Sequence, residues 1–455
     1  MSIAETLELA RARVRRGDDA AAQQAYIEVL REDPSNFFAL NELGTLALAG
    51  GYRAAARTAY AQAVEHHPDN NIARINLANV LREENDVEGA RRHYLAALAV
   101  DPQMPEAHQG MAWVLEELQL DGAEAHRERG YTGSSLVTKP YRGTGSAVPI
   151  LLLVSARGGN IPTQLWIDDK RFTVHAIYAD YHDVEAPLPP HALIMNAIGD
   201  ADLCARALTR AEQLVARSTA PVINRPERVS RTGRVDNARR LAGLPGLIVP
   251  RIGAMSRSAL LAAEELSYPL LLRSPGFHTG RHFVLVENRG HLPAALAALA
   301  GEEVLVIQYL DARGADGMAR KYRVMFIDGV TYPVHLAIGG DWKVHYFSAD
   351  MARTPAFREE ERLFLKDMPA MLGARAMVAL EAVRSTLGLD YAGIDFALAP
   401  DGSVLMFEAN ATMVICPPGP DPMWNYRRPA IEAALAAATR MLLRHAQRAG
   451  RAADV

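Results

Sequence analysis

The chain has 455 residues, of which 49% are hydrophobic and 22% charged, as is typical of a soluble globular protein of about three domains. The net charge of −4 argues against a nucleic-acid-binding surface, and no apolar run approaches the ~18 residues of a transmembrane helix. Two cysteines make no disulfide framework and the charged N-terminus has no signal-peptide core, so we expect a cytoplasmic protein.

A fixed 34-residue period runs through the first third of the chain. It links Pro34, Pro68 and Pro102; Tyr26, Tyr60 and Tyr94; and Leu9, Leu43, Leu77 and Met111. Each unit predicts a helix, a short polar break such as Gly50-Gly51, and a second helix that a proline ends. Such repetition indicates stacked pairs of helices.

This pattern resembles the tetratricopeptide repeat (TPR) family over residues 1 to about 130. The resemblance implies either a groove for a peptide or protein partner or a role in self-association, so a homodimer is an open alternative. Asn76-Leu77-Ala78-Asn79 is similar to the segment with which some TPR units contact a peptide. Alternatively, these asparagines only cap and solvate the groove.

Residues 131–148 are rich in Gly, Ser and Thr and predict a linker. Apolar runs at 150–154 and 192–196, each followed by an expected helix, then predict a small α/β domain. Between the first run and its helix, the Gly158-Gly159 turn either binds an anion on backbone N–H groups or is an ordinary connection.

From residue 221 onward the elements are strand-rich. Helices are expected at 234–241 and 369–387, and strands at 269–273, 283–286, 304–309, 322–327, 330–335, 391–398 and 404–410. Asp328-Gly329 and Asp401-Gly402 each separate two strand-like runs and predict hairpins.

The last hairpin carries the strongest chemical signal. Glu408 and Asn410 are two residues apart on one strand and therefore face the same side, and Asp395 lies on the partner strand. Such oxygen ligands suit Mg²⁺, and carboxylates on an apolar sheet need a counter-charge. The alternative is an edge hairpin whose polar groups are solvated.

Features typical of nucleotide binding lie upstream. Arg273 ends a buried strand before a loop with Gly276 and Gly280, whose backbone N–H groups can fold over phosphates. The strand that ends in Gln308-Tyr309-Leu310 offers backbone hydrogen bonds to an adenine edge, unless it is a plain core strand.

The order of these features resembles the ATP-grasp superfamily, in the branch of glutathione synthetase, D-alanine–D-alanine ligase and ribosomal-protein glutamate ligase. The resemblance covers about 149–445 and implies a multidomain fold, in which an all-α TPR array precedes an α/β pre-ATP-grasp domain and an α+β ATP-grasp domain. The implied segments are 1–130 (TPR), 131–148 (linker), 149–225 (pre-ATP-grasp), 226–300 and 301–445 (the two grasp subdomains) and 446–455 (tail).

The resemblance also implies ATP and Mg²⁺ as cofactors. Asp395, Glu408 and Asn410 would hold the metal, and Arg323 would contact the transferred phosphoryl group. The nucleotide-binding residues implied are Arg234, Arg273, Gly276, His278, Gly280, Gln308, Tyr309, Leu310 and Asp316, with Asp311 as an alternative to Asp316 at the ribose. Arg273 and Arg234 stand where the family has lysine, in a chain with only five lysines among 49 basic residues.

Further candidate catalytic residues flank Arg323. Lys321 and Lys343 can contact the substrates, and His335 or His345 is a candidate proton acceptor. A histidine satisfied by neighbouring backbone groups is the alternative for both. Cys416 has no recognisable base partner that would make it a nucleophile.

The expected function is an ATP- and Mg²⁺-dependent ligase that joins a carboxylate, activated as an acyl-phosphate, to an amine. The expected substrate is an amino acid or a peptide recruited with help from the repeats, with no nucleic-acid or membrane partner. The alternatives are a catalytically impaired TPR scaffold and a phosphotransferase that stops at the phosphorylated product.

Overall fold

The structure, a computed structural model, describes residues 1–277, 280–344 and 349–453, and side chains only as far as residue 447. The chain forms two compact units. Unit 1 comprises Met1–Pro149 and Asp169–Pro189, and unit 2 comprises Ile150–Asp168 and Pro190–Val455. Across the described ranges, no helix is long and apolar enough to cross a membrane.

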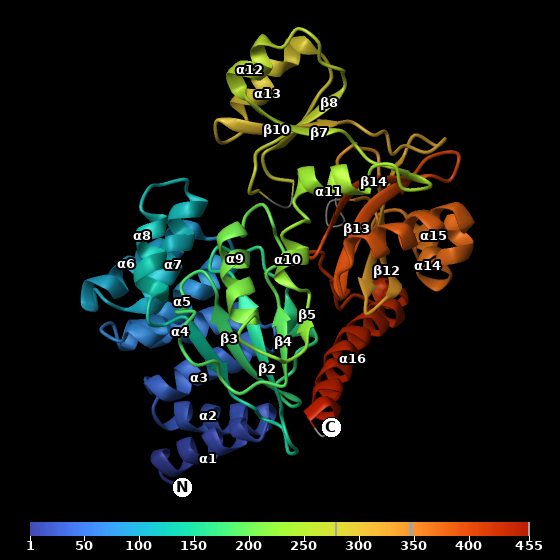
Figure 1. Ribbon diagram of the computed structural model, residues 1–455. Helices are drawn as coiled ribbons and strands as arrows, with labels where there is room; N and C mark the ends of the chain where they lie inside the picture. Colours follow the sequence, from blue (N-terminus) through green and yellow to red (C-terminus); the bar gives the residue numbers. More distant parts are fainter. Residues whose placement is uncertain (278–279, 345–348, 454–455) are drawn as a thin grey trace. The chain divides into compact units, whose positions relative to one another are not determined.

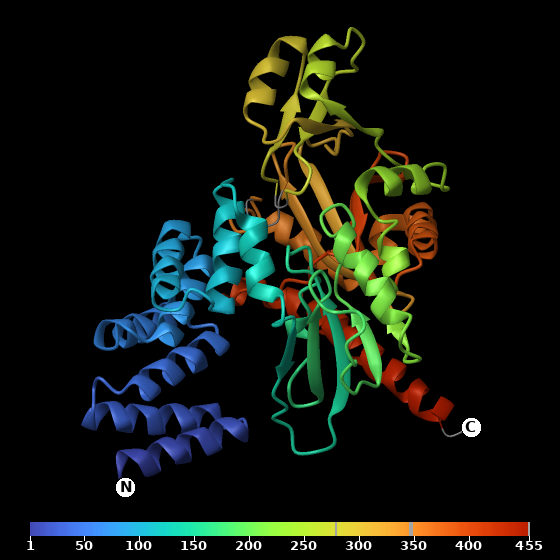
Figure 2. The ribbon, with the colours of Figure 1, turned by 60° about the vertical axis from the view of Figure 1, so that its left-hand side comes forward.

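Unit 1 begins with a stack of helix pairs, which Figure 2 shows in blue to teal. The helices are α1 (Ile3–Arg15), α2 (Asp19–Glu32), α3 (Phe37–Ala49), α4 (Arg53–His66), α5 (Asn71–Glu83), α6 (Val87–Val100), α7 (Pro105–Glu117) and α8 (Ala123–Tyr131). The breaks fall where the sequence predicts them, because Asp18 and Asp86 accept hydrogen bonds from the first turns of α2 and α6. The predicted helical repeat is confirmed.

Small residues at repeated positions let neighbouring helices touch. Tyr94 on α6 is fully buried and its hydroxyl donates to Asn79 Oδ1 at 2.6 Å. The ring lies against Gly110 on α7, where a Cβ atom would be 2.2 Å from the ring carbons. Tyr60 on α4 covers Gly44 in the same way. The tyrosines on the second helix of each pair therefore set the distance between neighbouring helices.

The asparagines of the expected groove are already engaged in this packing. Asn76 Nδ2 donates to Asn41 Oδ1 at 2.9 Å, and Asn79 holds the Tyr94 hydroxyl. The contact of Asn79 therefore favours a role in helix packing over peptide binding. Asn76 likewise links two helices through its bond to Asn41.

Unit 1 also contains two strands, β1 (Leu136–Lys139) and β3 (Phe172–Tyr178), which pair antiparallel. β1 lies inside the stretch that the sequence predicts as a linker. The rings of Tyr131 on α8 and Tyr178 on β3 are 4.5 Å apart, and Tyr181 donates to Glu124 on α8. The helix stack and residues 169–189 are therefore parts of one body.

Unit 2 starts with parallel strands β2 (Val148–Val154), β4 (Leu193–Asn196) and β5 (Val222–Ile223). Helix α9 (Ala205–Val215) lies between β4 and β5, and α10 (Pro226–Val229) follows β5. The buried residues of α9 are Ala207, Leu208, Ala211, Leu214 and Val215, which form one stripe. The helix expected after Gly158-Gly159 was wrong. Only a short 3₁₀ turn, η1 (Thr163–Leu165), follows, because both glycines have positive φ and Pro162 precedes that turn.

The next part of unit 2 is a four-stranded antiparallel sheet in the order β7-β10-β8-β9. Its strands are β7 (Ile252–Ser256), β8 (Leu270–Arg273), β9 (Phe283–Val286) and β10 (Glu303–Gln308). Figure 1 shows α12 (Arg257–Ala262) and α13 (Leu292–Ala297) over this sheet, and η2 (Arg289–His291) leads into α13. Buried leucines of both helices pack on β8 and β10.

The second sheet of unit 2 has the order β12-β11-β13-β14-β6. Its strands are β6 (Leu247–Ile248), β11 (Ala319–Ile327), β12 (Val330–Gly339), β13 (Tyr391–Leu398) and β14 (Val404–Asn410). Both predicted hairpins, β11–β12 and β13–β14, are confirmed. Around the sheet lie α14 (Pro355–Lys366), α15 (Met368–Leu387), η3 (Pro422–Arg427) and α16 (Arg428–Ala453).

Two polar side chains tie other segments to this sheet. Asn224, which follows β5 and has a φ of 53°, donates to the Tyr391 carbonyl and accepts from the Asp390 and Tyr391 amides. Asn237 on α11 (Arg234–Leu241) donates to the carbonyl of Ala409 on β14. The start of β13 and the end of β14 are thereby fixed by residues far away in the sequence.

The packing of Tyr94 on Gly110 gives a test of the repeat stack. Gly110→Ala should lower the free energy of unfolding of unit 1 by about 1–3 kcal/mol, since the added methyl group overlaps a fully buried ring that is also hydrogen-bonded. Gly145→Ala is the control, because no atom lies within 4 Å of the added Cβ. Thermal unfolding followed by circular dichroism measures the difference, and equal melting of the two variants would contradict this packing.

Candidate functional site

A cavity of about 720 Å³ in unit 2 is lined by residues from the four-stranded sheet and from the sheet β12-β11-β13-β14-β6. Predicted site residues that line it are Arg234, Arg273, Gly280, Gln308, Tyr309, Leu310, Lys321, Arg323, His335, Lys343, Asp395, Glu408 and Asn410. Residues separated by more than 170 positions in the chain thus surround one cavity.

Three predicted residues are not among the described lining. Gly276 lies in the β8–β9 loop with a φ of 78°. Asp316 is engaged elsewhere, because Arg320 donates to both of its oxygens at 2.9 and 2.8 Å, and this hydrogen bonding lowers the pKa of Asp316 to about 2. Asp311 is likewise paired with Arg313. His278 and His345 lie outside the described residues.

The β13–β14 hairpin places Asp395 directly opposite Glu408 in the strand register, and Asn410 opposite Gly393. The register shifts just after Asp395, so the hairpin contains a bulge beside the two carboxylates. Both acids belong to the cavity wall. The alternative of an edge hairpin with solvated groups is wrong for Asp395, which is 5% exposed on a strand with a neighbour on either side.

Asp395 is neutralised by two cations from β11. Arg323 donates to its two oxygens at 2.6 and 2.8 Å, and Lys321 Nζ is 3.3 Å from Oδ2. Burial by itself raises the pKa of Asp395, but Arg323 and Lys321 outweigh burial and lower the pKa below its ordinary value. The carboxylate is therefore ionised in the folded protein.

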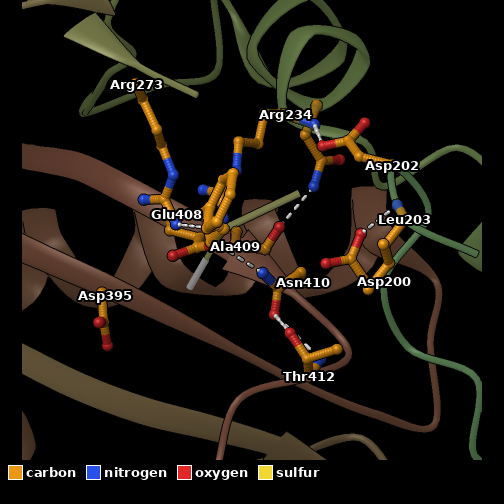
Figure 3. A network of polar contacts seen from close by, with 12 residues as sticks. Asp200, Asp202, Leu203, Arg234, Arg273, Asp395, Glu408, Ala409, Asn410 and Thr412 are labelled. Atoms are coloured by element: carbon orange, nitrogen blue, oxygen red, sulfur yellow. Dashed lines mark hydrogen bonds and ion pairs between the residues drawn. The ribbon is translucent and has the colours of Figure 1, made fainter. Parts of the chain in front are cut away.

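Glu408 has its own cationic partners. Arg234 on α11 contacts Oε1 at 2.6 Å, and Asn410 Nδ2 donates to the same oxygen at 2.9 Å. Burial raises the pKa of Glu408, and the charges of Arg234 and Arg273 more than compensate, so the pKa falls. In Figure 3 both arginines reach toward Glu408, while Asp395 lies apart on the neighbouring strand.

Arg273 ends β8 as the sequence predicts. Its guanidinium donates to the Phe277 carbonyl and lies 5.4 Å from the centre of the Phe283 ring. Burial, followed by repulsion from Arg234, lowers the pKa of Arg273 to about 10. A bound anion would stabilise the charged form of Arg273, because it would offset both the burial and the repulsion from Arg234.

His335 on β12 lies opposite Arg323 in the β11–β12 register and is 4% exposed. Burial, and then repulsion by Arg323, lowers its pKa well below 6.5. The imidazole is therefore neutral at pH 7. A neutral imidazole can accept a proton, but a depressed pKa makes it a weak base, so its proposed catalytic role is not strengthened by this environment.

Lys343 joins the two sheets across the cavity. Its Nζ donates to the carbonyls of Gly280 and Phe283 in the β8–β9 segment, and Trp342 packs edge-on against Phe283 at 5.4 Å. Ile252, Leu271 and Ile307 are paired in the strand register and line the wall beside Gln308, and Met406 also lines the cavity. We call the wall beside Gln308 the apolar end of the cavity; other parts of its lining are cationic.

Sequence reasoning missed the residues that support Glu408. The Arg234 backbone N–H donates to Asp202 at 3.0 Å (Figure 3). Asn237, one helical turn further on, donates to the carbonyl of Ala409, which lies between Glu408 and Asn410. Asn410 Oδ1 accepts from the backbone N–H and hydroxyl of Thr412. No local pattern signals Asn237, because its partner is 172 residues away.

The oxygen atoms of Asp395, Glu408 and Asn410 suit a hard divalent cation in type. Their charges are at present balanced by arginine and lysine, so a cation would have to replace these partners. Within the described ranges, no cluster of three or more His, Cys, Asp or Glu side chains is arranged around a common point for a metal. The candidate set is therefore two carboxylates and one amide.

Comparison with known proteins identifies the repeats. A tetratricopeptide repeat family model matches residues 7–52 and 41–105, which together with the helix pairs makes the N-terminal region a TPR array. The chain is similar to a solved structure named "MamA MSR-1 C2" (19% identity, 29% of this chain and 75% of that chain, TM-score 0.26). It is also similar to the solved structure named "Crystal structure of MamA protein" (18% identity, 29% of this chain and 72% of that chain, TM-score 0.27). No curated protein matches the chain.

The buried histidine makes stability depend on pH. An unfolded chain has its histidine pKa near 6.5, whereas that of folded His335 is well below, so between these values the unfolded state binds more protons. The free energy of unfolding should therefore fall as pH drops below about 6.5, with His335 contributing up to about 1.4 kcal/mol per pH unit.

Denaturant titrations of the wild-type protein and His335→Gln between pH 7.5 and 5 test this dependence. The variant should lose less stability on acidification, while other histidines contribute equally to both proteins. Parallel pH profiles would show that His335 does not titrate with a depressed pKa.

Proposed function

We propose that unit 2 is an ATP-grasp carboxylate–amine ligase that binds ATP in the cavity lined by the four-stranded sheet and the sheet β12-β11-β13-β14-β6. The observation that supports this best is the pairing of a cationic cavity with two opposed carboxylates on one hairpin. The substrate carboxylate would attack the γ-phosphorus of ATP and release ADP. An amine would then attack the acyl carbon, release phosphate and give up a proton as the amide forms.

The charges in the cavity favour a polyanionic ligand. Among the described lining residues, Arg234, Arg273, Lys321, Arg323 and Lys343 are cationic, against the two carboxylates Asp395 and Glu408. Arg320 also lines the cavity, but it is neutralised by Asp316 and Glu360. The surplus of positive charge suits a nucleoside triphosphate together with a carboxylate substrate.

Each cation has a place in this scheme. Arg273 and Arg234, at the end of β8 and the start of α11, would hold the phosphates with directed hydrogen bonds. Arg323 would stabilise the charge of the transferred phosphoryl group from β11, and Lys321 and Lys343 would hold the substrate carboxylate or the nucleotide. The apolar end at Gln308, Tyr309 and Leu310 would receive the base.

Asp395, Glu408 and Asn410 would hold Mg²⁺. When bound, the metal would neutralise oxygens of the transferring phosphoryl group, and the chain's own residues would position it. The match is one of donor chemistry, since all three side chains offer oxygen and the two acids face each other across the hairpin.

For the repeats we propose recruitment of a peptide or protein substrate or partner, as TPR arrays commonly provide. Such recruitment would raise the effective substrate concentration near unit 2. A catalytically inactive scaffold is the second candidate, because the repeats are the part of the chain that a family model matches. A phosphotransferase that releases the acyl-phosphate is the third.

Replacing Glu408 with Gln should reduce Mg²⁺-dependent ATP turnover about 100-fold or more, since the substitution removes one charge from the proposed metal site within an intact hairpin. Glu303→Gln, at an exposed position on β10, is the matched control and should retain wild-type turnover. Release of ADP measures both. Near-normal turnover in Glu408→Gln would exclude the metal role.

The three candidate functions differ in their response to an amine. A ligase should release ADP and free phosphate only when a suitable acid and amine are both present. A phosphotransferase should release ADP with the acid alone and keep the phosphoryl group in its acyl-phosphate product, and a scaffold should release neither with any pair. A panel of amino acids and short peptides, scored by release of ADP, by release of phosphate and by the mass of the product, separates them.

A further inference from the structure

Glu408 and Arg234 form the contact in the cavity that a bound cation would have to break. Their atoms are 2.6 Å apart, and the two side chains are only 26% and 17% exposed. A guanidinium and a divalent cation cannot both approach Glu408 Oε1 at bonding distance, because like charges repel strongly in a partly dehydrated site. Arg234 therefore stands where the metal would bind.

We infer that Arg234 is an exchange residue: it neutralises Glu408 in the ligand-free protein and moves to the nucleotide phosphates when the metal takes its place. This inference rests on the proposed function and adds an order of binding to it. Metal alone should bind weakly, because it must displace a paired arginine, and the acidic groups that remain near Arg234, Asp200 and Asp202, carry less charge than a polyphosphate acceptor. Nucleotide supplies that acceptor.

The anchoring of Arg234 supports the exchange. Its backbone N–H is held by Asp202, and Asn237 on the same helix holds Ala409 beside Glu408. The backbone at both ends of the ion pair is thus fixed, while the guanidinium lies at the end of a side chain with several rotatable bonds. Figure 3 shows Arg234 extending from α11 to Glu408 alongside Arg273. A swing of the side chain alone can redirect the charge.

Asp395 has a different arrangement. It is 5% exposed and held by two cations, with Arg323 bonded to both of its oxygens and also to the Val414 carbonyl. Glu408 is more exposed and is in ion-pair contact with Arg234, while Arg273 is a second cation nearby. Removing the charge of Arg234 should therefore free one carboxylate for a metal, whereas removing Arg323 would leave a buried acid with only Lys321.

Exchange has a reciprocal consequence. If nucleotide raises the affinity for metal by drawing Arg234 away, metal must raise the affinity for nucleotide by the same factor. In a variant whose residue 234 cannot pair with Glu408, nucleotide should raise the metal affinity by a smaller factor, because the metal no longer has to displace a cation.

Titration of full-length protein with MnCl₂, read by the electron paramagnetic resonance signal of free Mn²⁺, tests the inference without relying on turnover. Wild-type protein should bind Mn²⁺ at least about tenfold more tightly when a non-hydrolysable ATP analogue is present. In Arg234→Gln, the affinity for Mn²⁺ without nucleotide should rise at least about tenfold over wild type, and the added Glu408→Gln should abolish that gain.

Two further variants make the result specific. Arg234→Lys keeps the charge and should keep the nucleotide dependence, which also covers the case in which Arg234→Gln fails to fold. Arg313→Gln removes an exposed arginine that pairs with Asp311 and should behave as wild type. Circular dichroism confirms the fold of each.

The outcomes separate this inference from the proposed function. Nucleotide-dependent Mn²⁺ binding in wild type, with no gain in a folded Arg234→Gln, would overturn the exchange and leave the ligase proposal standing. Equal Mn²⁺ affinity with and without the analogue in wild type would also overturn it. No Mn²⁺ binding in wild type under either condition would remove the metal site and the proposed function with it.

Discussion

The site depends on the neutralisation of two carboxylates in a largely dehydrated cavity. Asp395 and Glu408 face each other on one hairpin, where burial alone would favour their protonated forms. Arg323, Lys321 and Arg234 keep them ionised. Breaking one side of such a pair typically costs about 3–5 kcal/mol, because it leaves an uncompensated charge. The positions of β11 and α11 relative to the hairpin follow from this requirement.

The rest of unit 2 serves to bring these charges together. The β11–β12 and β13–β14 hairpins are built locally by Asp-Gly turns, and they set Arg323, His335, Asp395 and Glu408 side by side. The four-stranded sheet contributes Arg273, and α11 contributes Arg234. Asn237 then fixes α11 to β14 through the Ala409 carbonyl. Because the cations come from β8, α11 and β11, the cavity forms only when both sheets have folded.

Sequence alone predicted the parts of the fold that have local causes. The repeats were visible because proline, tyrosine and small residues recur every 34 positions, and the carboxylate hairpin because side chains alternate along strands. Long-range contacts left no such signal: neither the Asn237–Ala409 bond nor strand β1, inside a Gly/Ser-rich stretch, could be predicted. At Asp316, the structure adds an ion pair with Arg320 four residues away, and the expected ribose contact stays a prediction.

The most direct test of the account is a crystal structure of the protein grown with Mn²⁺ and a non-hydrolysable ATP analogue, with anomalous diffraction measured at the manganese edge. The account predicts an anomalous peak within coordinating distance of both Asp395 and Glu408, with phosphate oxygens against Arg273 and Arg234. A nucleotide bound outside the cavity, or a manganese peak away from both carboxylates, would contradict it.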